Sequence, residues 1–172
     1  MRTKISIVPI IAATFLLSSC ASQAPKPKYM DEKNEAKYSK SRTLAEPPEK
    51  VLRAARNVLD ELTKESEPQA PDAVKSEDDA IFTGWVYGQA KDKYVQYDYN
   101  GTPRRKQLAL RRTYGFTVNP TLAGSQVAMK VEEELQEIDL KSGEPKGWKR
   151  VETDPAAYDL LLRRLREQIR AQ

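Results

Sequence analysis

The chain has 172 residues, a length that accommodates one domain and a terminal segment. It contains 29 basic and 25 acidic residues, and two of the basic ones, Arg2 and Lys4, lie in a leader-like N-terminus. The rest is close to neutral and lacks the clustered positive charge of nucleic-acid-binding proteins. The chain has no histidine and one cysteine. The commonest general base and metal ligand are therefore missing, and we expect neither a cofactor nor a metal.

The first twenty residues are typical of a bacterial lipoprotein signal peptide. Basic residues precede an apolar run from Ile5 to Leu17, which is too short to span a bilayer as a helix. A lipobox-like sequence follows, with a branched residue and two small residues before a cysteine: Leu17, Ser18, Ser19 and Cys20. We expect residues 1–19 to be removed and Cys20 to be lipidated as the new N-terminus. An ordinary signal peptide and an N-terminal membrane anchor are the alternatives.

The residue after the cysteine bears on the final location. Several acyl chains on Cys20 would hold the protein stably on a membrane, since one chain alone gives marginal binding. An Asp at the next position resembles the inner-membrane retention signal of enteric bacteria, whereas this chain has Ala21. The sequence therefore predicts a lipid anchor in the outer membrane, with the protein on its periplasmic face.

Residues 20–45 are predicted to contain the lipidated cysteine and a flexible tether. The segment is rich in Lys, Ser, Glu and Pro and has almost no aliphatic side chains. It cannot bury enough apolar surface to offset the entropy of ordering. The alternative is a partner-binding peptide that folds on contact, anchored by Tyr29, Met30 and Tyr38.

Amphipathic helices are predicted at both ends of the remaining single domain, residues 46–172. The first spans Pro47 to Lys64, because it has proline in its first turn and apolar residues at spacings of three and four. The second spans Asp154 to Arg170 and begins with an N-cap aspartate followed by proline. Its other face carries arginines, which we interpret as a solvated face.

Between the helices the apolar period changes to two, which predicts antiparallel strands at about 80–87, 93–99, 105–118 and 126–138. Asn100-Gly101 is a strong hairpin signal between the second and third strands. A last hairpin at Ser142-Gly143 brings Trp148 back along the fourth strand. The predicted fold is α+β and helix-grip-like: an antiparallel meander of four to five strands packed on an N-terminal and a C-terminal helix.

Parity and charge suggest how these strands pair. We expect a register in which the residue numbers of two paired residues, one in the third strand and one in the fourth, add up to about 243. Tyr114 then faces Met129 on the inside, and Arg111 faces Glu132 on the outside. Arg112 and Glu133 then become diagonal neighbours at the rim of the buried face. A tight loop over residues 88–92 would set the first strand against the second and turn five side chains toward the helices: Phe82, Val86, Val95, Tyr97 and Tyr99.

The best candidate for a partner-binding site is a group of aromatic residues on the outer face of the sheet: Trp85, Tyr87 and Tyr94. Trp and Tyr are enriched among the residues that dominate the binding energy of protein interfaces. The alternative is that these side chains are covered by the Ser66–Lys75 loop or by the tether. The sequence contains no nucleophile elbow, phosphate-binding glycine loop or metal-ligand spacing, so we expect no enzyme activity.

These features together resemble the BamC family of outer-membrane lipoproteins, which belong to the machine that inserts β-barrels. The resemblance rests on the lipobox, the first helix, the segment Ile81–Val86 and the last helix. It implies a helix-grip domain and assigns no functional residue. The family carries two such domains and a long N-terminal segment, whereas this chain has room for one domain and a short tether.

We therefore expect a non-enzymatic envelope lipoprotein that is held at the membrane by its lipid and binds another envelope protein as an assembly or scaffold factor. One alternative is a carrier that holds a lipid or another apolar ligand between sheet and helix. Another is a cell-wall-binding module. Large side chains that should fill the core count against the carrier: Tyr97, Tyr114, Phe116, Met129, Leu161 and Leu165.

Overall fold

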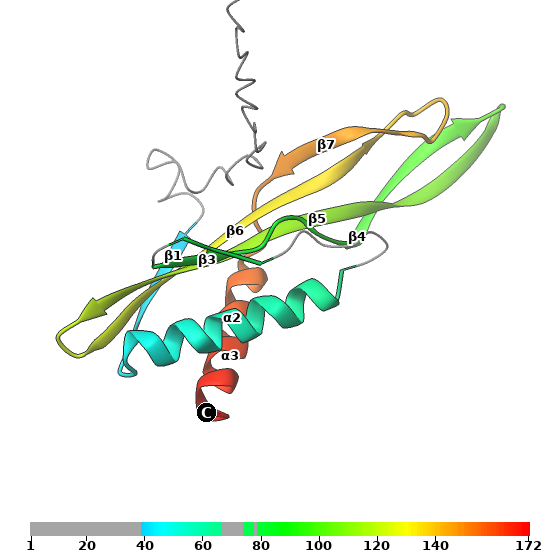
Figure 1. The fold of residues 1–172 in the computed structure, drawn as a ribbon. Coiled ribbons are helices and arrows are strands. Elements are labelled where there is room, and N and C mark those ends of the chain that lie inside the picture. The colour runs from blue at the N-terminus through cyan, green and yellow to red at the C-terminus, as the bar shows by residue number, and fades with distance from the viewer. Residues whose placement is uncertain (1–38, 67–73, 78) are drawn as a thin grey trace, which may run out of the picture.

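The computed structural model describes residues 39–66, 74–77 and 79–172. Along the chain the elements are β1 (Ser39–Leu44), α2 (Pro48–Lys64), β2 (Lys75–Glu77), β3 (Ala80–Phe82), β4 (Val86–Tyr99), β5 (Thr102–Thr121), β6 (Gly124–Ile138), β7 (Pro145–Val151) and α3 (Pro155–Arg170). One antiparallel sheet holds these seven strands, and both helices lie on the same face of it (Figure 1). The predicted α+β, helix-grip-like fold is confirmed, with more strands than the four to five expected.

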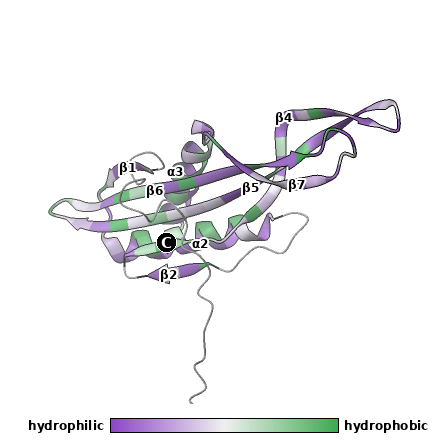
Figure 2. Cartoon of the chain, turned by 90° about the horizontal axis from the view of Figure 1, so that it is seen from above, coloured by the Kyte–Doolittle hydropathy of each residue, from purple (hydrophilic) through white to green (hydrophobic). Residues whose placement is uncertain are grey.

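Both predicted helices are confirmed, and their ends follow the expected local chemistry. Pro48 occupies the first turn of α2, where its missing N–H costs no hydrogen bond. α3 is capped by Asp154, whose carboxylate accepts a hydrogen bond from the Ala156 N–H at 2.9 Å. Figure 2 shows apolar and polar residues alternating along α2, as expected for a helix with one buried side.

One hydrophobic core lies between the sheet and the two helices. Phe116 and Val131 of the central strands and Leu161 of α3 have no measurable exposure to solvent. Of the side chains that were predicted to fill the core, all belong to it except Tyr97. The core draws on both helices and on the central part of the sheet, and it includes no residue between 90 and 109.

The central hairpin of β5 and β6 has the predicted faces in a different register. Tyr114 lies opposite Val131, and Arg111 lies opposite Glu134, so partner numbers sum to 245 rather than 243. The strands continue to Thr121 and Gly124, which pair across a two-residue turn that is tighter than the loop we expected. A shift of two residues preserves side-chain parity, so the buried face is the predicted one.

The predicted hairpin between residues 80–87 and 93–99 is wrong, because both segments pair with β5. β3 pairs with residues 115–117 of β5, and β4 pairs with residues 102–112. Four residues of β4, 90–93, lie opposite the single residue Leu108, and within this bulge Asp92 has a φ of 57°. The expected turn is thus a bulge within one long strand.

Residues 39–44 form an edge strand, although the sequence predicts a tether there. β1 runs antiparallel to β6, from Ser39 opposite Lys130 to Leu44 opposite Ser125. Leu44 is buried in the core, and the Lys40 ammonium lies 4.8 Å from the centre of the Tyr158 ring on α3. The domain boundary expected near residue 46 is therefore wrong for these six residues. Their composition concealed the strand, because an edge strand with exposed side chains needs few apolar residues.

Beyond the helices the sheet continues as a projecting arm, formed by residues 90–107 and 137–147 (Figure 1). The Asn100-Gly101 turn ends one hairpin of the arm, and both residues have positive φ, 53° and 75°, as the predicted tight turn requires. The arm closes on itself, because the Asp98 N–H donates to the Leu140 carbonyl at 2.9 Å. Lys106 Nζ also donates to the Gly143 carbonyl at 3.0 Å.

Tyr97 and Tyr99, which were predicted to face the helices, lie in the arm instead. Tyr97 packs directly on Gly143, leaving no room for a Cβ atom there. Tyr99 is 45% exposed near the tip. The prediction that these rings face the helices is wrong, because the helices do not extend to this part of the sheet (Figure 1).

Candidate protein-binding site

An arginine held between two tryptophans forms the centre of the candidate site. The guanidinium carbon of Arg111 lies 4.2 Å from the centre of the Trp85 ring and 4.5 Å from that of Trp148. Arg111 also donates from Nε and Nη2 to one carboxylate oxygen of Glu134, at 2.9 and 2.6 Å. The Tyr87 ring meets Trp148 edge-on, with ring centres 5.9 Å apart. We call Trp85, Tyr87, Arg111 and Trp148 the aromatic cluster.

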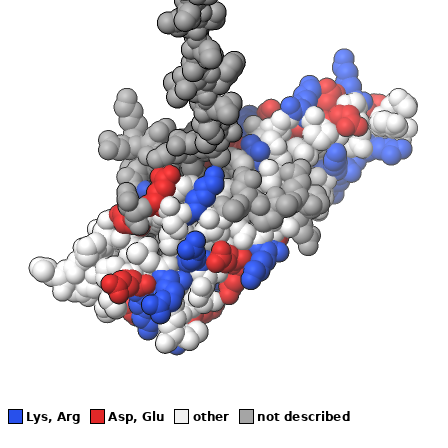
Figure 3. All heavy atoms as spheres, in the orientation of Figure 1, with Lys and Arg blue, Asp and Glu red and all other residues white. Residues whose placement is uncertain are grey.

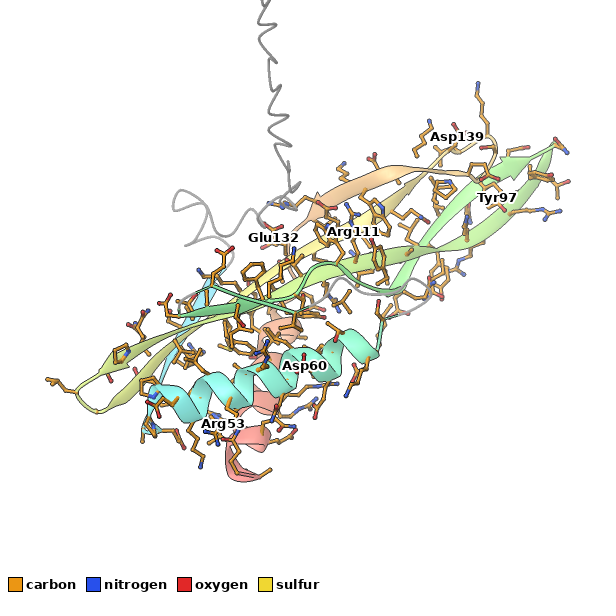
Figure 4. All side chains as sticks on the ribbon, viewed as in Figure 1. Arg53, Asp60, Tyr97, Arg111, Glu132 and Asp139 are labelled. Atoms are coloured by element: carbon orange, nitrogen blue, oxygen red, sulfur yellow. The ribbon has the colours of Figure 1, made fainter. Side chains whose placement is uncertain are left out.

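Strand pairing brings the cluster together from β4, β5 and β7 and the segment before β4. Tyr87 lies opposite Arg111, Arg111 lies opposite Glu134, and Trp148 lies opposite Gln136 on β6. Because side chains alternate along β5, Arg111 points away from the helix-facing Tyr114 side. Figure 4 places Arg111 and Glu132 at the sheet, with Arg53 and Asp60 below them on α2.

Two of the three predicted partner-binding residues lie together in the structure, and the third lies apart from them. Trp85 and Tyr87 are half-buried in the aromatic cluster. Tyr94 lies opposite Gln107, four residues along β5 from Arg111, which is about 13 Å at 3.3 Å per residue. Its ring instead stacks with Arg105, whose guanidinium carbon is 3.8 Å from the ring centre. The expectation that the three rings lie close together is therefore wrong for Tyr94, because the bulge in β4 was not predicted.

Sequence reasoning missed Arg111 and Trp148 as members of the site. The predicted register pairs Arg111 with Glu132, so its position between the rings was not foreseen. The returning hairpin that carries Trp148 is confirmed, but the sequence did not relate Trp148 to Trp85. Gln136 lies two residues from Glu134 on β6, so their side chains point to the same face of the sheet. Because Trp148 pairs with Gln136 and Arg111 pairs with Glu134, this spacing could have placed Trp148 and Arg111 on one face.

The acidic residues of β6 pair with arginines on both faces of the sheet. Glu132, almost fully buried, accepts from Arg150 at 2.6 Å on the face of the aromatic cluster. On the other face Arg112 donates to Glu133 at 2.8 Å. The two residues of that predicted pair lie directly opposite each other rather than diagonally. These carboxylates serve as ion-pair partners that fix the register.

Tyr114 and Arg112 form a second polar group beneath the sheet. Burial raises the pKa of the Tyr114 hydroxyl, and the hydrogen-bonded Arg112 opposes that shift. For Arg112, burial alone would lower the pKa, but Tyr114 and Glu133 raise it overall. Tyr114 is therefore a neutral phenol that lies beside a cation paired with Glu133.

A cavity of about 150 Å³ lies between the end of α2 and the sheet, where the carrier hypothesis would place a ligand. Leu62, Glu65, Arg112 and Tyr114 contribute to its lining. Small-molecule sites usually enclose about 300–1,000 Å³. The cavity is therefore small for a lipid, and its lining is partly charged.

Several predicted features lie outside the described residues. These are the lipobox, Leu17, Ser18, Ser19 and Cys20, the proposed tether anchors Tyr29, Met30 and Tyr38, and most of the Ser66–Lys75 loop. Within residues 39–66, 74–77 and 79–172, no three His, Cys, Asp or Glu side chains gather as metal ligands would. In the same ranges, neither helix has the length and apolar character needed to cross a bilayer.

Comparisons with known proteins identify no function. No family model matches the chain, and no curated protein matches it. Among solved structures, the chain is similar to TTHA0849 from Thermus thermophilus, with 16% sequence identity. The match covers 78% of this chain and 97% of that one, with a TM-score of 0.30.

Proposed function

We propose that this chain is a lipid-anchored, non-enzymatic envelope protein that binds another envelope protein on the helix-free face of its sheet. The observation that carries the proposal is the aromatic cluster, which gathers two Trp, one Tyr and one Arg on that face. These are the residue types in which interface hot spots are enriched. The lipobox-like sequence ending at Cys20 supports the anchor.

The cluster is suited to binding because its side chains are already ordered. Arg111 is fixed by Glu134 and by both indole rings, and its side chain keeps 20% of its exposure. A partner that covers these half-buried rings would lose little side-chain entropy on the cluster side. Assembly or scaffolding is the kind of task that needs such a surface and no catalytic group.

Site-specific photocrosslinking in intact envelopes tests the partner surface. A benzophenone amino acid would replace Gln89 or Gln136, which flank the cluster on β4 and β6, and Arg163 on α3 would serve as the control position. We expect the same envelope protein, identified by mass spectrometry, to be crosslinked from both sheet positions and not from α3. Adducts formed equally at all three positions, or at none, would contradict the proposal.

Matched alanine variants connect the crosslink to the cluster. Tyr87→Ala removes an edge contact with Trp148 but leaves the Trp85–Arg111–Trp148 stack. It should weaken binding of the purified partner by roughly 30-fold, the effect of losing a hot spot of about 2 kcal/mol. Tyr94→Ala lies on the same strand outside the cluster and should have little effect. Equal losses in the two variants would argue against a site at the cluster.

The anchor is tested separately, by fractionation. Cys20→Ser removes the thiol that would receive the lipid, so the protein should leave the membrane fraction. Unchanged membrane association of this variant would reject the lipid anchor while leaving the partner surface open to its own test.

A further inference from the structure

The β4–β5 hairpin of the arm is basic and rich in tyrosine. Between residues 90 and 107 it carries Lys91, Lys93, Arg104, Arg105 and Lys106, against only Asp92 and Asp98. Asp98 is engaged in the turn, since its carboxylate accepts from the Gly101 N–H at 2.6 Å. Figure 3 shows Lys and Arg side chains along the arm, with Asp and Glu between them. The hairpin therefore clusters positive charge, contrary to the expectation from the near-neutral total, because β4 and β5 bring together basic residues that are separated in the sequence.

Two arginine–tyrosine stacks lie on opposite faces of this hairpin. Arg105 stacks on Tyr94 at 3.8 Å, and Arg104 lies over Tyr99 at 4.9 Å. Neighbouring residues of a strand point to opposite faces, so the two stacks face in opposite directions. Both tyrosine residues remain 44–45% exposed. The hairpin thus presents the same chemistry, an exposed phenol ring beside a guanidinium, on each side.

The other hairpin of the arm adds one exposed apolar side chain at a tip that is otherwise polar. Between residues 137 and 147 it carries Glu137, Asp139 and Glu144 against Lys141 and Lys146, so it adds no positive charge to the arm. Leu140 is 59% exposed and lies beside Lys141 at the rim of an open groove of about 610 Å³. Lys146 also lines this groove and pairs with Asp139 at 2.9 Å. Hydrogen bonds between Asp98 and Leu140 and between Lys106 and Gly143 hold the two tips together. The exposed Leu, the tyrosines and the basic side chains therefore form one end of the molecule.

We infer that this arm docks on an anionic lipid surface, a second membrane contact in addition to the predicted acyl anchor. Tyrosine is enriched at headgroup level, where its ring is partly apolar and its hydroxyl stays hydrated. Basic side chains gain from the negative potential of anionic lipids. A projecting hairpin with both stacks exposed would be surrounded by headgroups, whereas a protein partner docked on one face would leave the second stack unused.

The length of the chain before the domain is compatible with such docking. Eighteen residues separate Cys20 from Ser39, and a fully extended chain of that length reaches about 60 Å at most. A lipidated Cys20 would therefore allow Ser39 to lie up to about 60 Å from the bilayer, which leaves the domain free to bring its arm to the membrane. The inference concerns the arm and does not require the protein partner proposed for the aromatic cluster.

Vesicle sedimentation tests the inference. The protein would be the chain from residue 20 with Cys20→Ser, which contains every described residue and carries no acyl chain. The probes would be vesicles of phosphatidylcholine alone and vesicles of equal parts phosphatidylcholine and phosphatidylglycerol. We expect binding to the anionic vesicles, weakened by salt, and little binding to the neutral ones.

Charge-matched variants locate the contact on the arm. R104Q with R105Q should weaken binding to anionic vesicles by roughly 25-fold, at about fivefold for each basic side chain near the surface. R163Q with R166Q makes the same charge change on exposed residues of α3 and should change binding little. Thermal unfolding of both variants would confirm that they are folded. Equal losses in the two pairs would show attraction by net charge only and would overturn the inference.

A fluorescent label reports which end of the molecule touches the lipid. Cys20→Ser removes the only cysteine, so Leu140→Cys and Leu122→Cys each give a single labelling site. Leu122 lies fully exposed in the β5–β6 turn, at the opposite end of the sheet from the arm. An environment-sensitive dye should shift its emission to the blue on anionic vesicles at position 140 and not at 122.

Each remaining outcome is decisive. A parent chain that fails to bind anionic vesicles, or a blue shift at position 122 alone, would overturn the inference. Crosslinking of the arm to an acidic protein without vesicle binding would assign the basic hairpin to a protein partner instead. None of these results depends on the Gln89 and Gln136 crosslinks, so the arm and the aromatic cluster can fail independently.

Discussion

Arg111 combines three interactions that depend on the shape of its guanidinium. A planar group can stack between Trp85 and Trp148 while its edge donates two hydrogen bonds to Glu134. A lysine ammonium has the same charge but neither the plane nor the fork. The stability of the cluster should therefore respond to a substitution that is conservative in charge.

We predict that Arg111→Lys lowers the free energy of unfolding by roughly 1–3 kcal/mol, the sum expected for a partly buried stack and a two-donor ion pair. Chemical denaturation followed by tryptophan fluorescence measures it. Arg105→Lys is the matched control, because Arg105 stacks on the exposed Tyr94. That change should stay within about 0.5 kcal/mol of the parent. Similar losses in both variants would show that the Trp85–Arg111–Trp148 stack has no special role.

Asp139 is the residue whose ionisation should be most visible at the arm tip. Hydrogen bonds from Lys146 and from the backbone N–H groups of Lys141 and Ser142 lower its pKa from 3.8 to about 2. A lowered pKa means that the folded state favours the carboxylate. Its contribution to stability is therefore fully present above pH 3.8 and is lost as the pH falls toward 2.

A carbon-detected NMR titration of the Asp139 carboxyl should show a midpoint near 2, and Lys146→Gln should move that midpoint upward. A midpoint of 3.8 or above for Asp139 would show that the turn does not hold its carboxylate in this way.

At the scale of elements, β1 depends on a close backbone approach at the start of β6. Gly124 has a φ of 138° and packs directly against the backbone of Leu44 and Ala45 at the end of β1. An added Cβ would meet backbone atoms, which cannot rotate away as a side chain could. The junction between β1 and the rest of the sheet should be sensitive to this one position.

Gly124→Ala should detach β1, with a cost of about 1–3 kcal/mol from the backbone conformation alone. Amide hydrogen exchange would show it as lost protection of residues 39–44, while the core amides around Phe116 remain protected. Gly88→Ala is the control, because a Cβ at Gly88 meets open space. Retained protection of β1 in the Gly124 variant would contradict this account.

Some elements could be predicted from the sequence alone and others could not. The difference is whether an element is determined by neighbouring residues or by residues far away in the sequence. Asp154-Pro155 and Asn100-Gly101 act through their own backbone, so α3 and the β4–β5 turn could be predicted from a few residues. The bulge at 90–93 depends on the distant Gln107, whose amide donates to the Ala90 carbonyl at 2.9 Å. No local pattern carries that information.

The candidate site shows the same division. Trp85 and Tyr87 were found because residue type and parity are readable in the sequence. Trp148 joins them only because the sheet brings β4 and β7 close enough for an edge-on ring contact across two intervening strands. Such curvature results from the twist and bulges of the whole sheet, and single strands do not reveal it.

At the scale of the whole molecule, the helix-covered body and the arm are separable by their packing. The core includes no residue between 90 and 109, although β5 runs without interruption through both parts. Gln89 and Ala109 lie directly opposite each other on β4 and β5. A two-residue turn could therefore join them without changing the register of the body.

We predict that replacing residues 90–108 by Asn-Gly leaves a body that still unfolds cooperatively, because its core is intact. The urea dependence of unfolding should decrease in proportion to the surface removed. Circular dichroism and tryptophan fluorescence, using the retained Trp85 and Trp148, measure both properties. A shortened chain without a cooperative transition would show that the β4–β5 hairpin of the arm is part of the folding unit.

The edge position of β1 also has a mechanical consequence. If Cys20 is held in a bilayer, any pull on the domain is applied at Ser39, the end of β1 that lies opposite Lys130. A force along the strand would load all β1–β6 hydrogen bonds together, whereas a force across it would break them one at a time. Release of the six residues of β1 would lengthen the connection between Cys20 and the domain by about 20 Å, at 3.3 Å per residue. Under tension the first strand would therefore lengthen the connection to the membrane, and its full release would withdraw Leu44 from the core.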